Sequence, residues 1–96
     1  MAYGLVLEFE ANESDYWAVN EHLGIARSSQ DGYPAGMIVH AAGPTPTGWV
    51  VTEVWDSKAS QEAFMATRLH EALDAVGLGN PTRITETETV NFQQLT

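Results

Sequence analysis

The sequence predicts a single α+β domain in which the elements follow the order strand, helix, strand, strand, helix, strand. Two observations support this prediction. Several segments alternate apolar and polar residues, the period of a half-buried strand, whereas two others repeat every three to four residues, as an amphipathic helix does. The chain has 96 residues, 44% of them hydrophobic and 18% charged, which suits one globular domain spanning residues 1–96.

The first two elements are a strand and a helix. Residues 3–10, YGLVLEFE, alternate and predict a strand. In residues 12–24 the period lengthens: Asn12 or Ser14 can cap a helix, and Gly24 suits the left-handed position that ends it. One face of this helix carries Tyr16, Val19, Asn20 and Leu23.

A hairpin follows the loop that residues 25–36 predict. Its strands are MIVHAAG, residues 37–43, and WVVTEVW, residues 49–55, with PTPTG between them as the turn. If the turn takes all five of these residues, His40 falls opposite Thr52, and Val50 and Val54 lie on the same side of the sheet.

A second helix and a last strand complete the chain. Ser57 can cap a helix that runs to about Val76 and ends at Gly77. Its apolar side carries Phe64, Leu69, Leu73 and Val76. Residues 82–92, TRITETETVNF, alternate again and predict the last strand.

This order is that of the ferredoxin-like βαββαβ arrangement, a four-stranded antiparallel sheet with two helices on one face. The other face of the sheet would be bare, although apolar residues occupy both faces of several strands. A second subunit is the simplest cover for that face, so we expect a homodimer.

The stretch GWVVTEVWDSKASQEAFMATRLHEAL, residues 48–73, resembles the third strand and second helix of the dimeric α+β barrel superfamily, which includes antibiotic-biosynthesis-type monooxygenases. The resemblance rests on Trp55, Asp56, Ser57, Ala63 and Phe64 and on the order of elements. It implies pairing of two ferredoxin-like domains into a dimeric α+β barrel. The superfamily contains both enzymes and proteins of unknown role, so the resemblance indicates fold more strongly than activity.

The composition and charge of the chain argue against several classes of binding partner. Four Lys and Arg against thirteen Asp and Glu give a net charge of −9, which repels nucleic acid and anionic lipid. No stretch approaches the roughly 20 apolar residues of a membrane span, and the acidic N-terminal segment does not resemble a signal peptide. The absence of cysteine fits a reducing compartment, so we expect a cytoplasmic protein.

His40 is the candidate catalytic residue because it lies within an apolar strand, where it could act as a general base. The alternative is a structural histidine that only donates a hydrogen bond. Glu53 lies between Val51 and Trp55 on a probable central strand and therefore needs a partner, which Arg83, Thr87 or His40 could supply.

Tyr16, Trp55 and Phe64 are the candidate substrate-binding residues, because aromatic side chains can line a pocket for a planar molecule. The alternative is that they are ordinary core residues. The resemblance implies oxidation without a cofactor, in which the pocket desolvates a deprotonated substrate that itself activates oxygen. The sequence therefore predicts either a cofactor-independent monooxygenase acting on a small aromatic substrate, or a non-catalytic module that binds a small apolar ligand or dimerises.

We predict no cofactor and no metal site. His22 and His70 lie on separate helices and, with His40, have no local ligand spacing. In the haem-degrading branch of the superfamily, function depends on an Asn in the first strand and on a Trp and a His in the second helix. Here residues 3–10 contain no Asn, and Phe64 and a residue near Asp74 occupy the helix positions, which argues against haem degradation.

Overall fold

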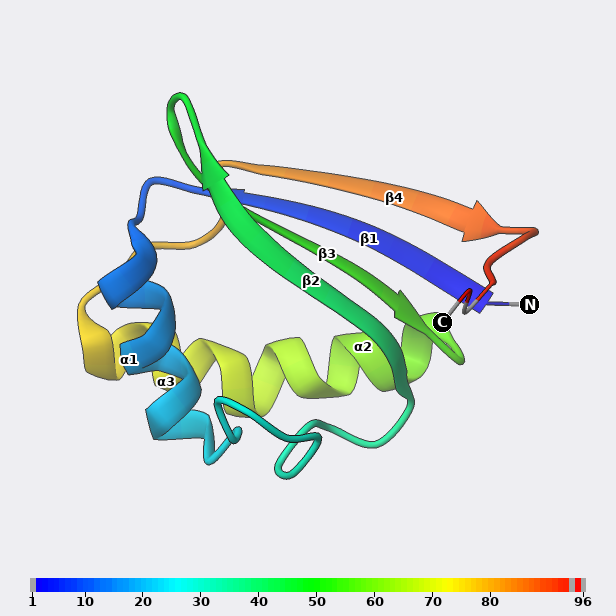
Figure 1. Cartoon of the computed structure of the whole chain (residues 1–96), viewed down its shortest axis with the longest axis horizontal. Helices are drawn as coiled ribbons and strands as arrows, with labels where there is room; N and C mark the ends of the chain where they lie inside the picture. Colours follow the sequence, from blue (N-terminus) through cyan, green and yellow to red (C-terminus); the bar gives the residue numbers. More distant parts are fainter. Residues whose placement is uncertain (1, 94, 96) are drawn as a thin grey trace.

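The computed structural model describes residues 2–93 and 95 and confirms the predicted α+β, ferredoxin-like class (Figure 1). Its elements are β1 (Ala2–Phe9), α1 (Glu13–Leu23), β2 (Met37–Thr45), β3 (Gly48–Trp55), α2 (Lys58–Phe64), η1 (Met65–Leu69), α3 (His70–Val76) and β4 (Arg83–Thr89). The four strands form one antiparallel sheet in the order β2-β3-β1-β4. Figure 1 shows the helices on one face of this sheet.

The α1 helix begins and ends as its sequence predicts. Of the two candidate caps, the structure uses Asn12: its side chain accepts a hydrogen bond from the Asp15 N–H, and the Asp15 carboxylate accepts one from the Asn12 N–H. Gly24 ends the helix with φ at 76°, a left-handed conformation that glycine adopts without strain.

The second predicted helix is continuous from Lys58 to Val76 but contains a π-helical segment, η1, in its middle. The wider turn places Phe64 and Leu69, five residues apart, in the core together. Ser57 caps the helix by accepting from the Ser60 N–H, and Gly77 ends it with φ at 82°. The predicted boundaries are confirmed, whereas the π turn has no counterpart in the prediction.

The core lies between the sheet and the helices. Its centre is Trp55, which is fully buried with its ring 5.7 Å from that of Phe64. Alternate residues of β1 and β3 supply the sheet side of the core, as the period of two requires: Tyr3, Leu5, Leu7, Trp49, Val51 and Trp55.

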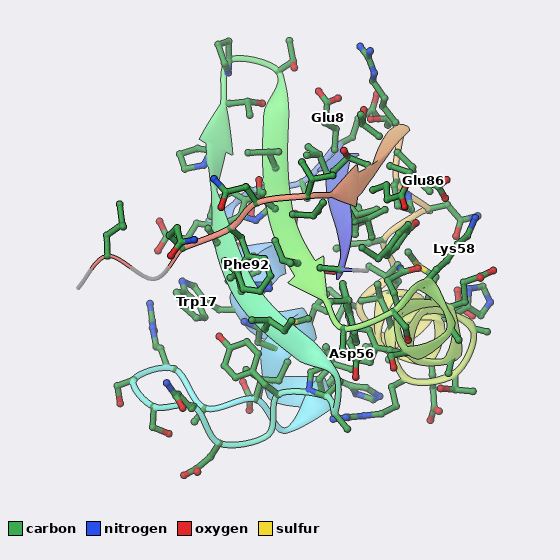
Figure 2. All side chains as sticks on the ribbon, turned by 90° about the vertical axis from the view of Figure 1, so that its right-hand side faces the viewer. Glu8, Trp17, Asp56, Lys58, Glu86 and Phe92 are labelled. Carbon is green, nitrogen blue, oxygen red and sulfur yellow. The ribbon has the colours of Figure 1, made fainter. Side chains whose placement is uncertain are left out.

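The last strand is shorter than predicted, because β4 ends at Thr89 rather than near Phe92. From Val90 the chain leaves β4 and runs across the end of the sheet towards β2 (Figure 2). The register with β1 places Glu86 on the helix side of the sheet, and Lys58 at the start of α2 faces it at 3.6 Å (Figure 2).

The opposite face of the sheet has no helix over it (Figure 1). Val6, Val50 and Val54 on this face are half-buried, and Val39 remains 40% exposed. Within the part of the chain that the structure describes, no helix combines the length and the apolar character needed to cross a membrane.

Candidate functional site

The register of the β2–β3 hairpin decides where His40 points, and the sequence prediction of this register is wrong. The turn is formed by residues 46 and 47 alone, since Thr45 pairs with Gly48. His40 therefore lies opposite Glu53 rather than Thr52. A shift of one residue moves a side chain to the other face of a sheet, so His40 lies on the helix side, away from Val50 and Val54.

Pro44 explains the misplaced turn. It was assigned to the turn because proline disrupts most strands, but β2 is an edge strand, where a residue without an N–H is tolerated. A bulge between Met37 and Val39 lies at the start of the same strand and leaves Ile38 48% exposed. Bulges commonly redirect side chains beside functional sites.

A chain of polar contacts crosses the site from α1 to β3. The Tyr16 hydroxyl lies 2.6 Å from His40 Nε2, and His40 Nδ1 lies 3.4 Å from Glu53 Oε2. The Trp55 indole N–H donates to Glu53 Oε1 at 2.9 Å. Of the three partners that the sequence offered for Glu53, the structure selects His40, and it adds Trp55.

The tautomer of His40 decides the direction of these contacts. Glu53 is 5% exposed and lies close to Nδ1, but Nδ1 has no partner in hydrogen-bond geometry among the described residues. With the ring proton on Nδ1, Nε2 accepts a hydrogen bond from the Tyr16 hydroxyl. The nearby Glu53 carboxylate favours this tautomer.

Burial raises the pKa of Tyr16 above its ordinary value of 10.0. A hydrogen bond with the Asn20 side chain acts in the opposite direction, and electrostatic interactions with Tyr33 and Glu53 add to the increase in the Tyr16 pKa. Tyr16 is therefore a neutral phenol at physiological pH and a hydrogen-bond donor to His40.

We call the contacts of Tyr16, His40 and Glu53 the His40 relay. A cavity of about 60 Å³ lies beside this relay, between the sheet and the helices. Three of the four residues predicted for the site line it: His40, Tyr16 and Phe64. The rest of the wall is mostly apolar, with Leu7, Val51, Leu69 and Leu73 among its residues. Such a cavity holds a few waters, whereas a benzene ring needs about 150 Å³.

Trp55, the fourth predicted residue, does not line the cavity. It contacts the site indirectly, through its hydrogen bond to Glu53 and its packing against Phe64. Sequence reasoning gave no place to Tyr33, whose ring lies 5.5 Å from that of His40. Tyr33 lies in a loop rich in Gly and Ser, where no periodic pattern predicts the direction of a side chain.

The other histidines lie apart from the site. His22 is exposed near the end of α1, and His70 is exposed and lies 3.4 Å from Asp74, one turn further along α3. Across residues 2–93 and 95, no group of three or more metal-ligating side chains comes together.

Comparison with known proteins shows similarity in structure. No protein-family model matches the sequence, and no curated protein matches it. A candidate antibiotic biosynthesis monooxygenase from Chloroflexus aurantiacus superimposes with a TM-score of 0.67 at 22% identity, covering 100% of both chains. Another from Deinococcus radiodurans gives 0.60 at 17% identity, covering 100% of this chain and 99% of the other. The chain has the fold of these monooxygenase-like proteins.

The same fold occurs in a dimeric ferredoxin-like protein of unknown function from Jannaschia, with a TM-score of 0.56 at 16% identity, covering 92% of this chain and 98% of the other. The resemblance that residues 48–73 predict is therefore confirmed for the monooxygenase-like fold. Identities at this level do not carry activity from one chain to another.

Proposed function

We propose that the protein is a monooxygenase-like enzyme that oxidises a small aromatic substrate without a cofactor, with His40 as the general base. The observation that carries this proposal is the Tyr16–His40–Glu53 relay at the wall of a mostly apolar cavity. A histidine beside a buried carboxylate in the wall of an apolar cavity is suited, once its Nε2 is free, to remove a proton from a bound phenol.

In the structure Tyr16 occupies the nitrogen that would act as the base. The cavity, with Tyr16 in its wall, is also too small for an aromatic ring. Both obstacles have one solution: substrate entry turns Tyr16 aside, which frees His40 Nε2 and enlarges the space. Tyr16 and Phe64 then form the walls around the ring, and Trp55 supports them from behind.

His40 would take the proton of the substrate hydroxyl at Nε2, and Glu53 would stabilise the resulting imidazolium. The deprotonated ring, held away from water, reacts with dioxygen, the second substrate. A ring CH₂ in the keto tautomer becomes a carbonyl, one oxygen atom enters the product and the other leaves as water.

Oxygen consumption with hydroxynaphthalenes and hydroxyanthracenes tests this proposal. We expect wild-type protein to consume oxygen with at least one compound and His40→Gln to lose the activity while keeping its fold. His70→Gln is the matched control, because His70 is exposed and does not line the cavity. Equal rates for wild type and His40→Gln would refute the assignment of the base.

The second candidate function is a non-catalytic module that binds a small apolar ligand. The small volume and mostly apolar wall of the cavity favour this candidate. A thermal-shift screen with the same compounds separates the two, since a ligand at 100-fold its Kd adds about 2.7 kcal/mol of stability whether or not it reacts. If His40→Ala keeps its fold and dimer but loses the shift, His40 belongs to the ligand site; loss of folding would make it a core residue.

We also propose that the protein works as a homodimer in the cytoplasm, paired through the sheet face away from the helices. The exposed Val39 and the half-buried valines beside it support this arrangement, as does the dimeric neighbour of the same fold. The net charge of −9 supports the prediction that nucleic acid is not a partner.

A further inference from the structure

The three tryptophans of the chain differ in the partner of their indole N–H. Trp17 donates to Glu13 and Trp55 donates to Glu53, each at 2.9 Å. Trp49 is 5% exposed, yet its Nε1 has no hydrogen-bond partner among residues 2–93 and 95. An indole nitrogen can only donate, so this group needs an acceptor.

Asn20 presents a second donor that is not fully paired. Its side chain is on α1, one turn after Tyr16, and the residue is 5% exposed. Its amide acts on the nearby Tyr16 hydroxyl, but the amide nitrogen has no partner in good hydrogen-bond geometry within the described residues. Both Asn20 and Trp49 line the cavity, Asn20 from the helix side and Trp49 from the sheet side.

Such donors on one cavity are unusual, because the large majority of buried polar side-chain atoms in proteins are paired. His40 Nδ1, on the same cavity, is a third group without a hydrogen-bond partner among the described residues. The Tyr16 ring, 5.1 Å from the Trp49 ring, connects this end of the cavity to the His40 relay. The walls around the donors are apolar. Both the Asn20 and the Trp49 donors therefore belong to side chains of the cavity wall, and the rest of that wall is mostly apolar.

We propose that the cavity binds a small, largely apolar ring compound through a carbonyl or deprotonated hydroxyl oxygen that accepts from Trp49 and Asn20. The role of this binding in catalysis rests on the proposed function. When a phenol gives its proton to His40, negative charge develops on the phenol oxygen. Preorganised N–H donors in a site without water stabilise such a charge. Trp49 and Asn20 are thus binding residues for the oxygen, distinct from the base.

The test compares cyclopentanone with methylenecyclopentane, which have nearly the same shape but differ in the acceptor oxygen. Binding is followed by the three indole N–H signals in a proton–nitrogen NMR spectrum, with Trp49→Phe identifying the Trp49 signal. We expect the ketone to bind about tenfold more tightly, the equivalent of one net hydrogen bond. The Trp49 signal should move, and those of Trp17 and Trp55 serve as internal controls because their donors are already paired.

Asn20→Leu keeps the shape of the side chain and removes the donor. We expect this variant to melt within a few degrees of wild type, because the amide nitrogen makes no hydrogen bond of good geometry, and to lose the preference for the ketone. Asn20→Leu also tests the proposal if Trp49→Phe does not fold. Asn80→Leu, at an exposed position outside the cavity, is the control and should keep the preference.

Equal binding of the two probes would overturn the inference, as would failure of both probes to bind. These outcomes are independent of oxygen consumption. A ketone preference without any oxidation would refute the proposed reaction and leave the binding site intact. Oxidation that Asn20→Leu leaves unchanged, together with equal probe binding, would refute the binding site only.

Discussion

Replacement of Trp55 by phenylalanine tests how the core supports the relay. Trp55 is fully buried, and its indole N–H donates to the buried carboxylate of Glu53. The smaller ring leaves a cavity that costs about 1 kcal/mol. Loss of a hydrogen bond to a charged group adds about 1.5–3 kcal/mol. We therefore expect Trp55→Phe to lower the free energy of unfolding by about 2.5–4 kcal/mol, and Trp55→Ala to lower it by at least 3–5 kcal/mol.

A double-mutant cycle separates the two contributions. Urea unfolding, followed by circular dichroism at one fixed protein concentration, gives the free energy for wild type, Trp55→Phe, Glu53→Leu and the double variant. Without the carboxylate the indole has no acceptor, so only the cavity contribution remains. The coupling free energy should be about 1.5–3 kcal/mol.

A coupling free energy near zero would show that the hydrogen bond does not stabilise the fold. It would refute the inference that Trp55 holds Glu53 in place. A melting temperature that Trp55→Ala leaves unchanged would place the ring in solvent and contradict its burial.

Three further outcomes follow from the structure. Burial, the hydrogen bond to Glu86 and nearby carboxylates raise the pKa of Tyr3 from 10.0 to about 12. The associated stabilisation is complete below pH 10 and is lost between pH 10 and 12, so chemical unfolding at each pH should show a steeper decline for wild type than for Tyr3→Phe. Gly48→Ala should destabilise by about 1–3 kcal/mol in urea, because its Cβ would clash with the Phe9 carbonyl oxygen, whereas Gly79→Ala, with open space around it, should be neutral. Light scattering at micromolar concentration should give a dimer mass for wild type and a monomer mass for Val54→Glu; a wild-type monomer would contradict the proposed interface.

Regular patterning explains why the sequence predicts the framework well. The period of β1, the Asn12 cap and the glycines at 24 and 77 are local signals, and each acts within a few residues of its own position. Element order, helix ends and the inward face of β1 follow from them. The end of β4 is less well predicted because residues 90–92 continue the alternation after pairing with β1 has stopped.

The site depends on relations that local patterns do not encode. The pairing of His40 with Glu53 depends on whether the turn takes two residues or five, and Pro44 misleads because its edge position is known only from the sheet order. The sequence places Asn20 on the inward face of its helix and Trp49 in an apolar strand. The lack of hydrogen-bond partners for their N–H groups becomes visible only when both walls of the cavity are in place.

The π turn at η1 is a position at which the second helix can change its length. In a regular α-helix, which advances about 100° per residue, Phe64 and Leu69 would lie about 140° apart around the axis, and the wider turn removes most of this difference. Deletion of one exposed residue within η1 would therefore restore an α-helix in which Leu69 and Leu73 follow Phe64 at intervals of four residues and still face the core. A one-residue alignment gap in this segment should mark a homologue that lacks the π turn and keeps the same cavity wall.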